Sequence, residues 1–176
     1  MSKRAGSYVT LQELVDEVGV DPVRFISNHS SGKMGYAIAA AAVEQGARVI
    51  LVSGPVSLAD PPGIEVVHVM TADEMYTATH ERINAVDVFI AAAAVSDYRP
   101  AEARAQKIKK SEETMHIELV RSKDILASVA ALDDGPFTVG FAAETEEIVA
   151  NARAKREKKG CDWIVANDVS ETAGTF

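Results

Sequence analysis

From residue 47 onward, apolar runs of strand length alternate with segments of helical spacing. The expected strands cover residues 47–53, 64–70, 87–95, 116–121, 137–143 and 161–166, and the expected helices cover 36–45, 72–84, 124–132 and 146–159. Strands that alternate with helices in this way form right-handed βαβ units around a mostly parallel sheet. We therefore predict an α/β fold with a Rossmann-like, doubly wound and mostly parallel sheet.

Several helix boundaries carry local signals. Thr71 and Glu74 have the spacing of a capping box, in which the hydroxyl accepts from the third helical amide and the carboxylate accepts from the capping residue's amide. Gly46 and Gly160 follow two of the helical patterns and are expected to end those helices.

The first 27 residues break the alternation. Residues 10–19 have helical spacing and their own capping box, at the place where a doubly wound fold needs its first buried strand. We therefore expect an atypical helical segment over residues 1–20, a main domain over 21–176, and a sheet that lacks its first strand.

Composition narrows the classes of protein. A chain of 176 residues suffices for one domain, and its net charge of −8 disfavours nucleic acid as a partner. The single cysteine, Cys161, excludes an intrachain disulfide, and the first residues lack the apolar core of a signal peptide. No apolar run approaches the ~20 residues that cross a bilayer. The expected protein is cytoplasmic and binds no membrane.

A candidate phosphate loop precedes the helix at 36–45. It contains Ser30, Ser31, Gly32 and Lys33, and small residues at a helix start expose amides beside the positive end of the helix dipole. A serine-capped helix start without a ligand is an equal alternative. The segment matches neither the Walker spacing nor G-x-G-x-x-G.

Further candidates follow the later strands, where ligands of open α/β sheets bind. Residues 91–94 are alanines that let a flat base or ribose approach the backbone, and Asp97 can accept from a ribose or base or help hold magnesium through water. For a lone aspartate, a turn-capping role is the favoured alternative. Residues 140–145 and 166–170 end two more strands, so the three strand ends describe one ligand edge.

Two basic clusters could contact a polyanion. Lys107 begins the first, KIKK (107–110), and could lie over a triphosphate. Lys155 and Lys159 share one face of the last helix. A solvated surface is the alternative for both clusters. The sequence contains no Ser-His-Asp triad, carboxylate pair or Cys/His metal cluster, and of the histidines only His29 lies near the expected site.

The longest motifs together resemble a known family. They are DPVRFISNHSSGKMG (21–35), LVSGP (51–55), AAVSDY (93–98), KIKK (107–110), GFAAET (140–145) and ANDVS (166–170). In this order they resemble phosphopantothenate–cysteine ligase, the C-terminal half of the bacterial bifunctional coenzyme A enzyme. The resemblance covers residues from about 21 to 176.

The resemblance implies an enzyme that joins 4′-phosphopantothenate to L-cysteine with CTP and Mg²⁺, through an acyl-cytidylate, and that forms a homodimer. It implies catalytic roles for Asn28, which serves the acyl-cytidylate, and for Lys107, the active-site lysine. The implied nucleotide-binding residues are Ala93, Asp97, Ser122, Lys123, Asp124, Ile125, Phe141, Lys155 and Lys159.

The chain departs from the family pattern in three places. Ser122-Lys123 stands where many bacterial relatives carry Asn-Pro or Thr-Pro. Residues 1–25 resemble a signature-loop segment of arginyl-tRNA synthetases, which indicates a chimera joined near 21–25. Residue 176 precedes the family's final strands.

Two alternatives to a working ligase remain. One is an inactive fragment that at most binds nucleotide. The other is an NAD(P)-binding Rossmann oxidoreductase, which the missing G-x-G-x-x-G disfavours.

Overall fold

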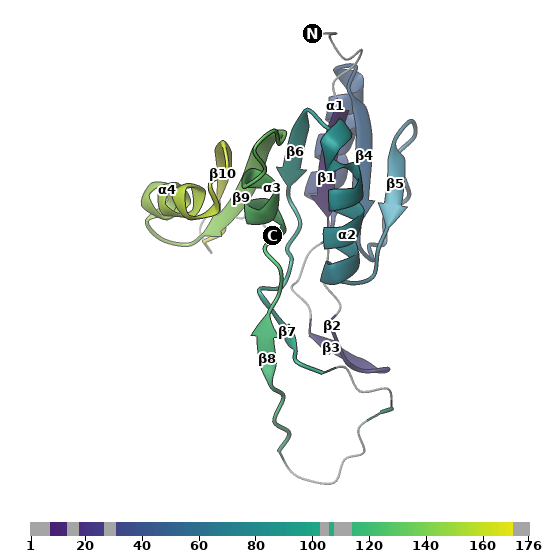
Figure 1. Cartoon of the computed structure of the whole chain (residues 1–176), viewed down its shortest axis with the longest axis vertical. Helices are drawn as coiled ribbons and strands as arrows, with labels where there is room; N and C mark the ends of the chain where they lie inside the picture. Colours follow the sequence, from purple (N-terminus) through teal and green to yellow (C-terminus); the bar gives the residue numbers. More distant parts are fainter. Residues whose placement is uncertain (1–7, 14–17, 27–30, 103–105, 108–113, 171–176) are drawn as a thin grey trace.

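A computed structural model describes residues 8–13, 18–26, 31–102, 106–107 and 114–170. A six-stranded sheet forms its centre (Figure 1). Its strands are β1 (Tyr8–Glu13), β4 (Arg48–Ser53), β5 (Glu65–His68), β6 (Val88–Ala91), β9 (Phe137–Glu144) and β10 (Trp163–Asp168). All five neighbouring pairs are parallel, which confirms the expected class of fold.

The strand order reverses direction at the centre of the sheet. Across the sheet the order is β10-β9-β6-β1-β4-β5, so the chain builds outward from β1 on one side and then returns to build outward from β6 on the other. This is the order of doubly wound dinucleotide-binding domains. In such sheets ligands bind beyond the carboxyl ends of the strands where the order reverses, here between β1 and β6.

The expectation of a helix at 10–19 and of a missing first strand is wrong. Tyr8–Glu13 is β1, which pairs with β4 along its whole length and also with β6, so that Leu11 lies opposite Leu51 and Ile90. Part of the remaining segment, Val18–Asp21, forms the short strand β2. Two parallel neighbours offer a continuous hydrogen-bonding ladder on both sides, and this tertiary pairing outweighs the local helical spacing.

Four α-helices connect the strands. They are α1 (Lys33–Glu44), α2 (Ala72–Arg82), α3 (Ile125–Ala130) and α4 (Ile148–Lys159), with a short 3-10 helix η1 (Ile83–Ala85) after α2. The capping box at the start of α2 is confirmed: Glu74 N donates to Thr71 Oγ1 at 3.1 Å, and Thr71 N donates to Glu74 Oε2 at 3.3 Å. Gly160 ends α4 in the left-handed region, as expected.

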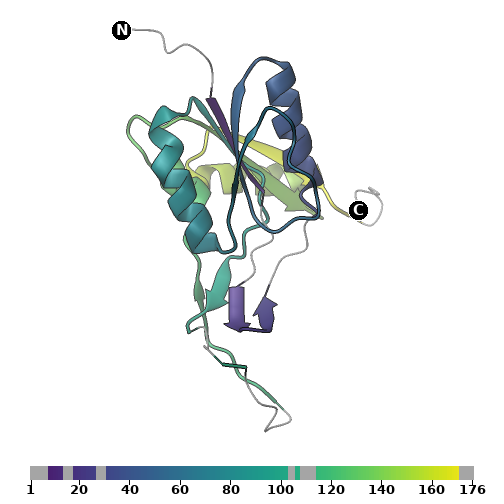
Figure 2. The same cartoon turned by 90° about the vertical axis from the view of Figure 1, so that its right-hand side faces the viewer.

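The sheet has a separate core on each face. Tyr36 and Ala39 of α1 pack with Leu51 on one face, whereas Met75 of α2 and Val129 of α3 belong to the cluster on the other. Figure 2 shows α1 and α2 flanking the first half of the sheet. None of the helices in the described ranges is long and apolar enough to cross a membrane.

Two antiparallel ribbons extend from the carboxyl edge of the sheet. One consists of β2 (Val18–Asp21) and β3 (Arg24–Ile26), and the other of β7 (Tyr98–Pro100) and β8 (Leu119–Arg121). β2 contacts β7, and both ribbons lie below the sheet in Figures 1 and 2. The strand expected at 116–121 is therefore part of a ribbon and not of the central sheet.

Candidate functional site

A cleft of about 1220 Å³ opens at the carboxyl edge of the sheet. The cleft is lined by five parts of the chain that are distant in sequence. They are the start of α1, the segment after β6, the turn after β8, one face of α4, and the ends of β9 and β10. The lining residues are 31–34, 91–98, 121–126, 141, 143, 144, 151, 154, 155, 158, 159, 167 and 169. The cleft therefore occupies the edge at which a doubly wound sheet binds its ligand.

The start of α1 forms one wall. Its capping position is Gly32, which has a φ of +73° and therefore a left-handed backbone that favours glycine. A Cβ atom at Gly32 would lie 2.7 Å from Val56 Cγ1. Because glycine has no side chain, Gly32 contributes no capping hydrogen bond to α1, and the first turn of α1 carries Lys33 and no acid. This arrangement favours an anion in front of the helix.

The segment after β6 forms the floor. Ala91 to Ala94 are half-buried and present only methyl groups. Ser96 Oγ donates to the carbonyl of Tyr98 at 2.8 Å, and the carbonyl of Asp97 accepts from Ser122 N at 2.9 Å. These bonds fix the segment against the turn after β8, while small side chains leave room for a planar group.

The turn Ser122 to Ile125 is the third wall. Asp124 Oδ1 accepts from Ala127 N at 3.1 Å and so caps α3, while Asp124 Oδ2 contacts Lys159 Nζ of α4. Ser122 Oγ is buried and has no hydrogen-bond partner among the described residues. A buried hydroxyl without a partner costs roughly 1–3 kcal/mol, so a ligand that bonded it would recover that energy.

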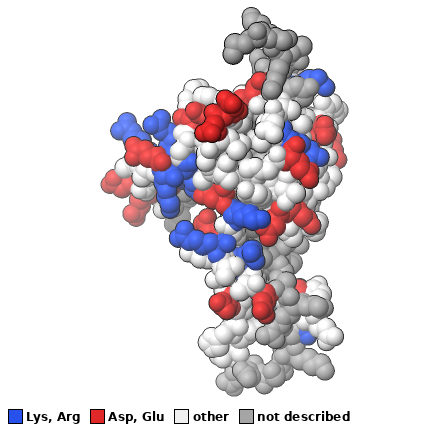
Figure 3. Space-filling view, in the orientation of Figure 1, with Lys and Arg blue, Asp and Glu red and all other residues white. Residues whose placement is uncertain are grey.

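Lysines of α4 provide half of the basic side chains that line the cleft. Lys155, Lys158 and Lys159 line the cleft, and Figure 3 shows basic side chains gathered over and below α4. Lys159 is engaged by Asp124. Of the cleft's lysines within the described ranges, Lys33, Lys155 and Lys158 have no ion pair, so they are the lysines available to an anionic ligand.

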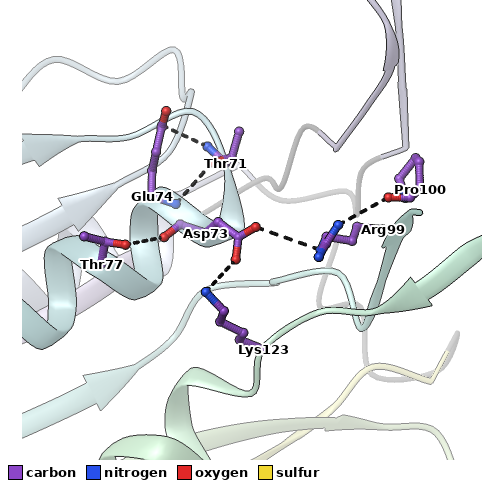
Figure 4. A network of polar contacts seen from close by, with 7 residues as sticks. All are labelled: Thr71, Asp73, Glu74, Thr77, Arg99, Pro100 and Lys123. Atoms are coloured by element: carbon purple, nitrogen blue, oxygen red, sulfur yellow. Dashed lines mark hydrogen bonds and ion pairs between the residues drawn. The ribbon is translucent and has the colours of Figure 1, made fainter. Parts of the chain in front are cut away.

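Lys123 is directed differently. Its Nζ lies 3.1 Å from Asp73 Oδ1 of α2 (Figure 4). The same Nζ lies 4.7 Å from the centre of the Tyr76 ring, which is also on α2. The same carboxylate lies 3.9 Å from Arg99 Nε of β7. Lys123 therefore lines the cleft while its charged end is directed to α2.

The sequence-predicted residues converge on this cleft. Ser31, Gly32, Lys33 and all nine predicted nucleotide-binding residues line it, whereas Lys107 is exposed and does not. Asn28 and Ser30 lie outside the described residues, as do residues 108–110 of the KIKK motif. What each residue does remains a prediction.

Asn151 and Arg121 are among the polar lining residues that the sequence analysis missed. Asn151 lies four residues before Lys155 on the same face of α4, and its Nδ2 donates to the carbonyl of Glu146 at 2.9 Å. Its spacing from the lysines was a usable signal. Arg121 directly precedes the turn and lies 5.9 Å from the centre of the Tyr98 ring, a contact that no local pattern indicates.

The polar ends of β9 and β10 close the cleft. Asn167 Nδ2 lies 3.7 Å from Met34 Sδ, which links the end of β10 to α1. Just beyond, hydrogen bonds from Ser170 lower the pKa of the exposed Asp168 carboxyl. No group of three or more His, Cys, Asp or Glu residues suited to a metal ion occurs in the described part of the chain.

Comparison with known proteins identifies the family. Residues 16–176 match the model of the DNA/pantothenate metabolism flavoprotein C-terminal domain. The chain belongs to this family. Curated relatives of the chain include the coenzyme A biosynthesis bifunctional protein CoaBC of Vibrio parahaemolyticus, 54% identical over 154 residues, which are 86% of this chain and 39% of the relative. The Escherichia coli protein of the same name is 53% identical over 161 residues, 89% of this chain and 40% of the relative.

Solved structures agree with this membership. The crystal structure of the C-terminal domain of CoaBC has a TM-score of 0.82 and 41% identity, and the match covers 94% of this chain and 79% of that one. A Cab2 mutant in complex with phosphopantothenate-cysteine has a TM-score of 0.77 at 16% identity, covers 93% of this chain and 73% of that one, and supports the fold alone. The chain spans about two fifths of the length of the curated relatives it matches.

Proposed function

We propose that this chain is a phosphopantothenate–cysteine ligase that uses CTP. The observation that carries the proposal is the single cleft in which the α1 start, the segment after β6, the turn after β8 and the lysines of α4 meet. A nucleoside triphosphate has one planar apolar end and one polyanionic end. The alanine floor with Phe141 suits the first, and the cations Lys33, Lys155 and Lys158 suit the second.

The proposed reaction has two steps. A carboxylate oxygen of 4′-phosphopantothenate attacks the α-phosphorus of CTP, and the bond to the bridging oxygen breaks to release pyrophosphate. The amine of L-cysteine then attacks the acyl carbon, loses a proton and displaces CMP. Both steps build negative charge on phosphate oxygens, which fixed cations stabilise in the transition state.

Particular residues are candidates for particular tasks. Asp97 can accept from the ribose or base, and the unpartnered Ser122 hydroxyl can bond the same ligand. Asn28 and Lys107 are the proposed catalytic residues by family resemblance. Mg²⁺ bound to a nucleotide needs only one or two protein carboxylates, which Asp97 and Glu144 of the cleft can provide. Bound there, the ion would neutralise the departing pyrophosphate.

The deciding experiment is pyrophosphate release by the folded chain. Release should require both CTP and 4′-phosphopantothenate, and phosphopantothenoylcysteine should form only when L-cysteine is added. CTP binding without pyrophosphate release would identify an inactive nucleotide-binding fragment, and preferential binding of NADH would favour a dinucleotide-binding protein instead.

Lys107 offers a sharper test of mechanism. Lys107→Gln should lower kcat more than it weakens CTP affinity, because a contact made only in the transition state contributes little to ground-state binding. Lys158→Gln is the matched control, because it removes a lysine that is expected to bind the same ligand. It should weaken CTP binding and have little effect on kcat. If Lys107→Gln, like Lys158→Gln, weakens CTP binding but leaves kcat nearly unchanged, Lys107 has no part in the chemistry.

A further inference from the structure

The start of α2 contacts the cleft-lining turn after β8, although α2 itself does not line the cleft. Asp73 Oδ1 lies 3.1 Å from Lys123 Nζ, and the Lys123 ammonium lies 4.7 Å from the centre of the Tyr76 ring. Figure 4 shows Asp73 between Lys123 and Arg99, so one carboxylate faces both the turn and the base of the β7–β8 ribbon.

A second contact joins α2 to α3. His80 Nε2 lies 2.9 Å from Ser128 Oγ, and Ser128 Oγ donates to the carbonyl of Ile125 at 2.8 Å. Tyr76 links the two contacts, since its ring lies 4.3 Å from that of His80. The turn Ser122 to Ile125 is therefore held from outside the cleft by a row of side chains on one helix.

We propose that Asp73 is a positioning residue for the nucleotide-binding turn, and that Lys123 acts as its anchor and not as a phosphate ligand. This inference rests on the proposed function. The direction of the Lys123 side chain supports it, because the ammonium is paired with Asp73 and stacked on Tyr76. The backbone of the turn, with the unpartnered Ser122 hydroxyl and the α3 cap Asp124, remains the part that meets the ligand.

A simpler role for Asp73 makes a different prediction. It lies in the first turn of α2, where any acid is favoured by the helix dipole. If Asp73 served only the helix dipole, replacing it would lower the stability of α2, and the size of that effect would not depend on which residue stands at position 123. An anchor predicts that Asp73 and Lys123 depend on each other.

The test is a double-mutant cycle on CTP affinity, measured by calorimetry with Mg²⁺ and the whole chain. Asp73→Asn and Lys123→Met should each weaken CTP binding about two- to five-fold, the range that an exposed ion pair contributes. The double variant should be no weaker than either single one. Lys123→Arg should restore near wild-type affinity, and Glu81→Gln, which removes an exposed acid of the same helix, should change nothing.

The cycle also has results that overturn the proposal. If Asp73→Asn tightens CTP binding, then Lys123 is a ligand that Asp73 restrains. If the losses in the double variant add, the two residues act independently. Either result refutes the anchor.

A readout without nucleotide separates this inference from the proposed function. In the free protein, Asp73→Asn and Lys123→Met should both accelerate hydrogen exchange of the amides in residues 121–130, and Glu81→Gln should not. If the wild-type chain fails to bind CTP, the proposed function fails, and the anchor stands or falls on this exchange result. Unchanged exchange in both variants refutes it.

Discussion

The helices α1 and α2 begin in opposite ways, although both pack against the same six-stranded sheet. α2 starts with a complete capping box at Thr71 and carries Asp73 and Glu74 in its first turn. α1 starts at Gly32, has no capping side chain, and carries Lys33 with no acid in its first turn. The helix dipole favours acids at this end, so α2 satisfies the rule and α1 breaks it.

The difference corresponds to the cleft. The start of α1 lines it, and the start of α2 does not. A helix start with its own cap and acidic residues serves stability, whereas one with a basic residue and no cap from its capping position favours an anionic ligand. If this comparison is correct, changes at the α1 start should affect ligand affinity, and loss of the α2 cap should affect stability.

The largest effect is expected from Gly32→Ala. The new Cβ would occupy a left-handed residue and lie 2.7 Å from Val56 Cγ1, so unfolding free energy should fall by about 2–4 kcal/mol and CTP binding should weaken. Gly46→Ala is the matched control, because Gly46 also has a positive φ, +84°, but nothing lies within 4 Å. Gly46→Ala should lower the unfolding free energy by only about 1–2 kcal/mol and should leave CTP affinity unchanged. Equal losses of stability in denaturant titrations would contradict the close contact at Gly32.

Lys33→Glu should separate stability from binding. An acid in the first turn of α1 should stabilise the helix by about 0.3–1 kcal/mol. The same change should weaken CTP binding at least about tenfold, or about 1.4 kcal/mol, because it reverses a charge in front of the phosphates. Thermal denaturation measures the change in stability, and calorimetry measures the change in CTP affinity. Unchanged CTP affinity would contradict the proposal that the start of α1 binds the phosphates.

Thr71→Ala should have the opposite profile. Loss of the cap should lower unfolding free energy by about 1 kcal/mol. CTP affinity should stay within about twofold, a change of roughly 0.4 kcal/mol, because Thr71 lies outside the cleft. A binding defect larger than the loss of stability would show that the Thr71 cap is part of the site.

The smallest effect concerns pH and His80 of α2. Burial lowers the pKa of His80 below its usual 6.5, so the unfolded chain binds more protons in mildly acidic solution. This contribution to stability is present above pH 6.5 and is lost as the pH falls below it. His80→Gln should flatten this part of the stability curve measured by denaturant titration. A steeper loss of stability with falling pH in the variant would contradict the lowered pKa of His80.

Much of the fold was predictable because the signals were local. The strand at 48–53 is a continuous apolar run, and Gly160 ends α4 where the sequence indicates. The capping box at Thr71 formed as expected because its partner lies three residues away. Of the candidate site, the residues at the ends of consecutive strands were predictable, since parallel strands bring their carboxyl ends to one edge.

Other features depended on residues far apart in the sequence. The direction of the Lys123 side chain depends on Asp73, fifty positions earlier, and no pattern near Lys123 indicates it. The engagement of Lys159 by Asp124 is of the same kind. The origin of residues 1–20 stays a prediction, and sequencing of the reading frame before Asp21 would test it.

The sequence by itself determined the class of fold, most helix boundaries, the family and the set of residues at the ligand edge. Tertiary structure alone decided that residues 8–13 form the central strand, because two neighbouring strands supply hydrogen bonds that local helical spacing cannot match. It also decided which lysines remain available to a ligand, because ion pairing depends on distances between elements that meet only in the folded chain.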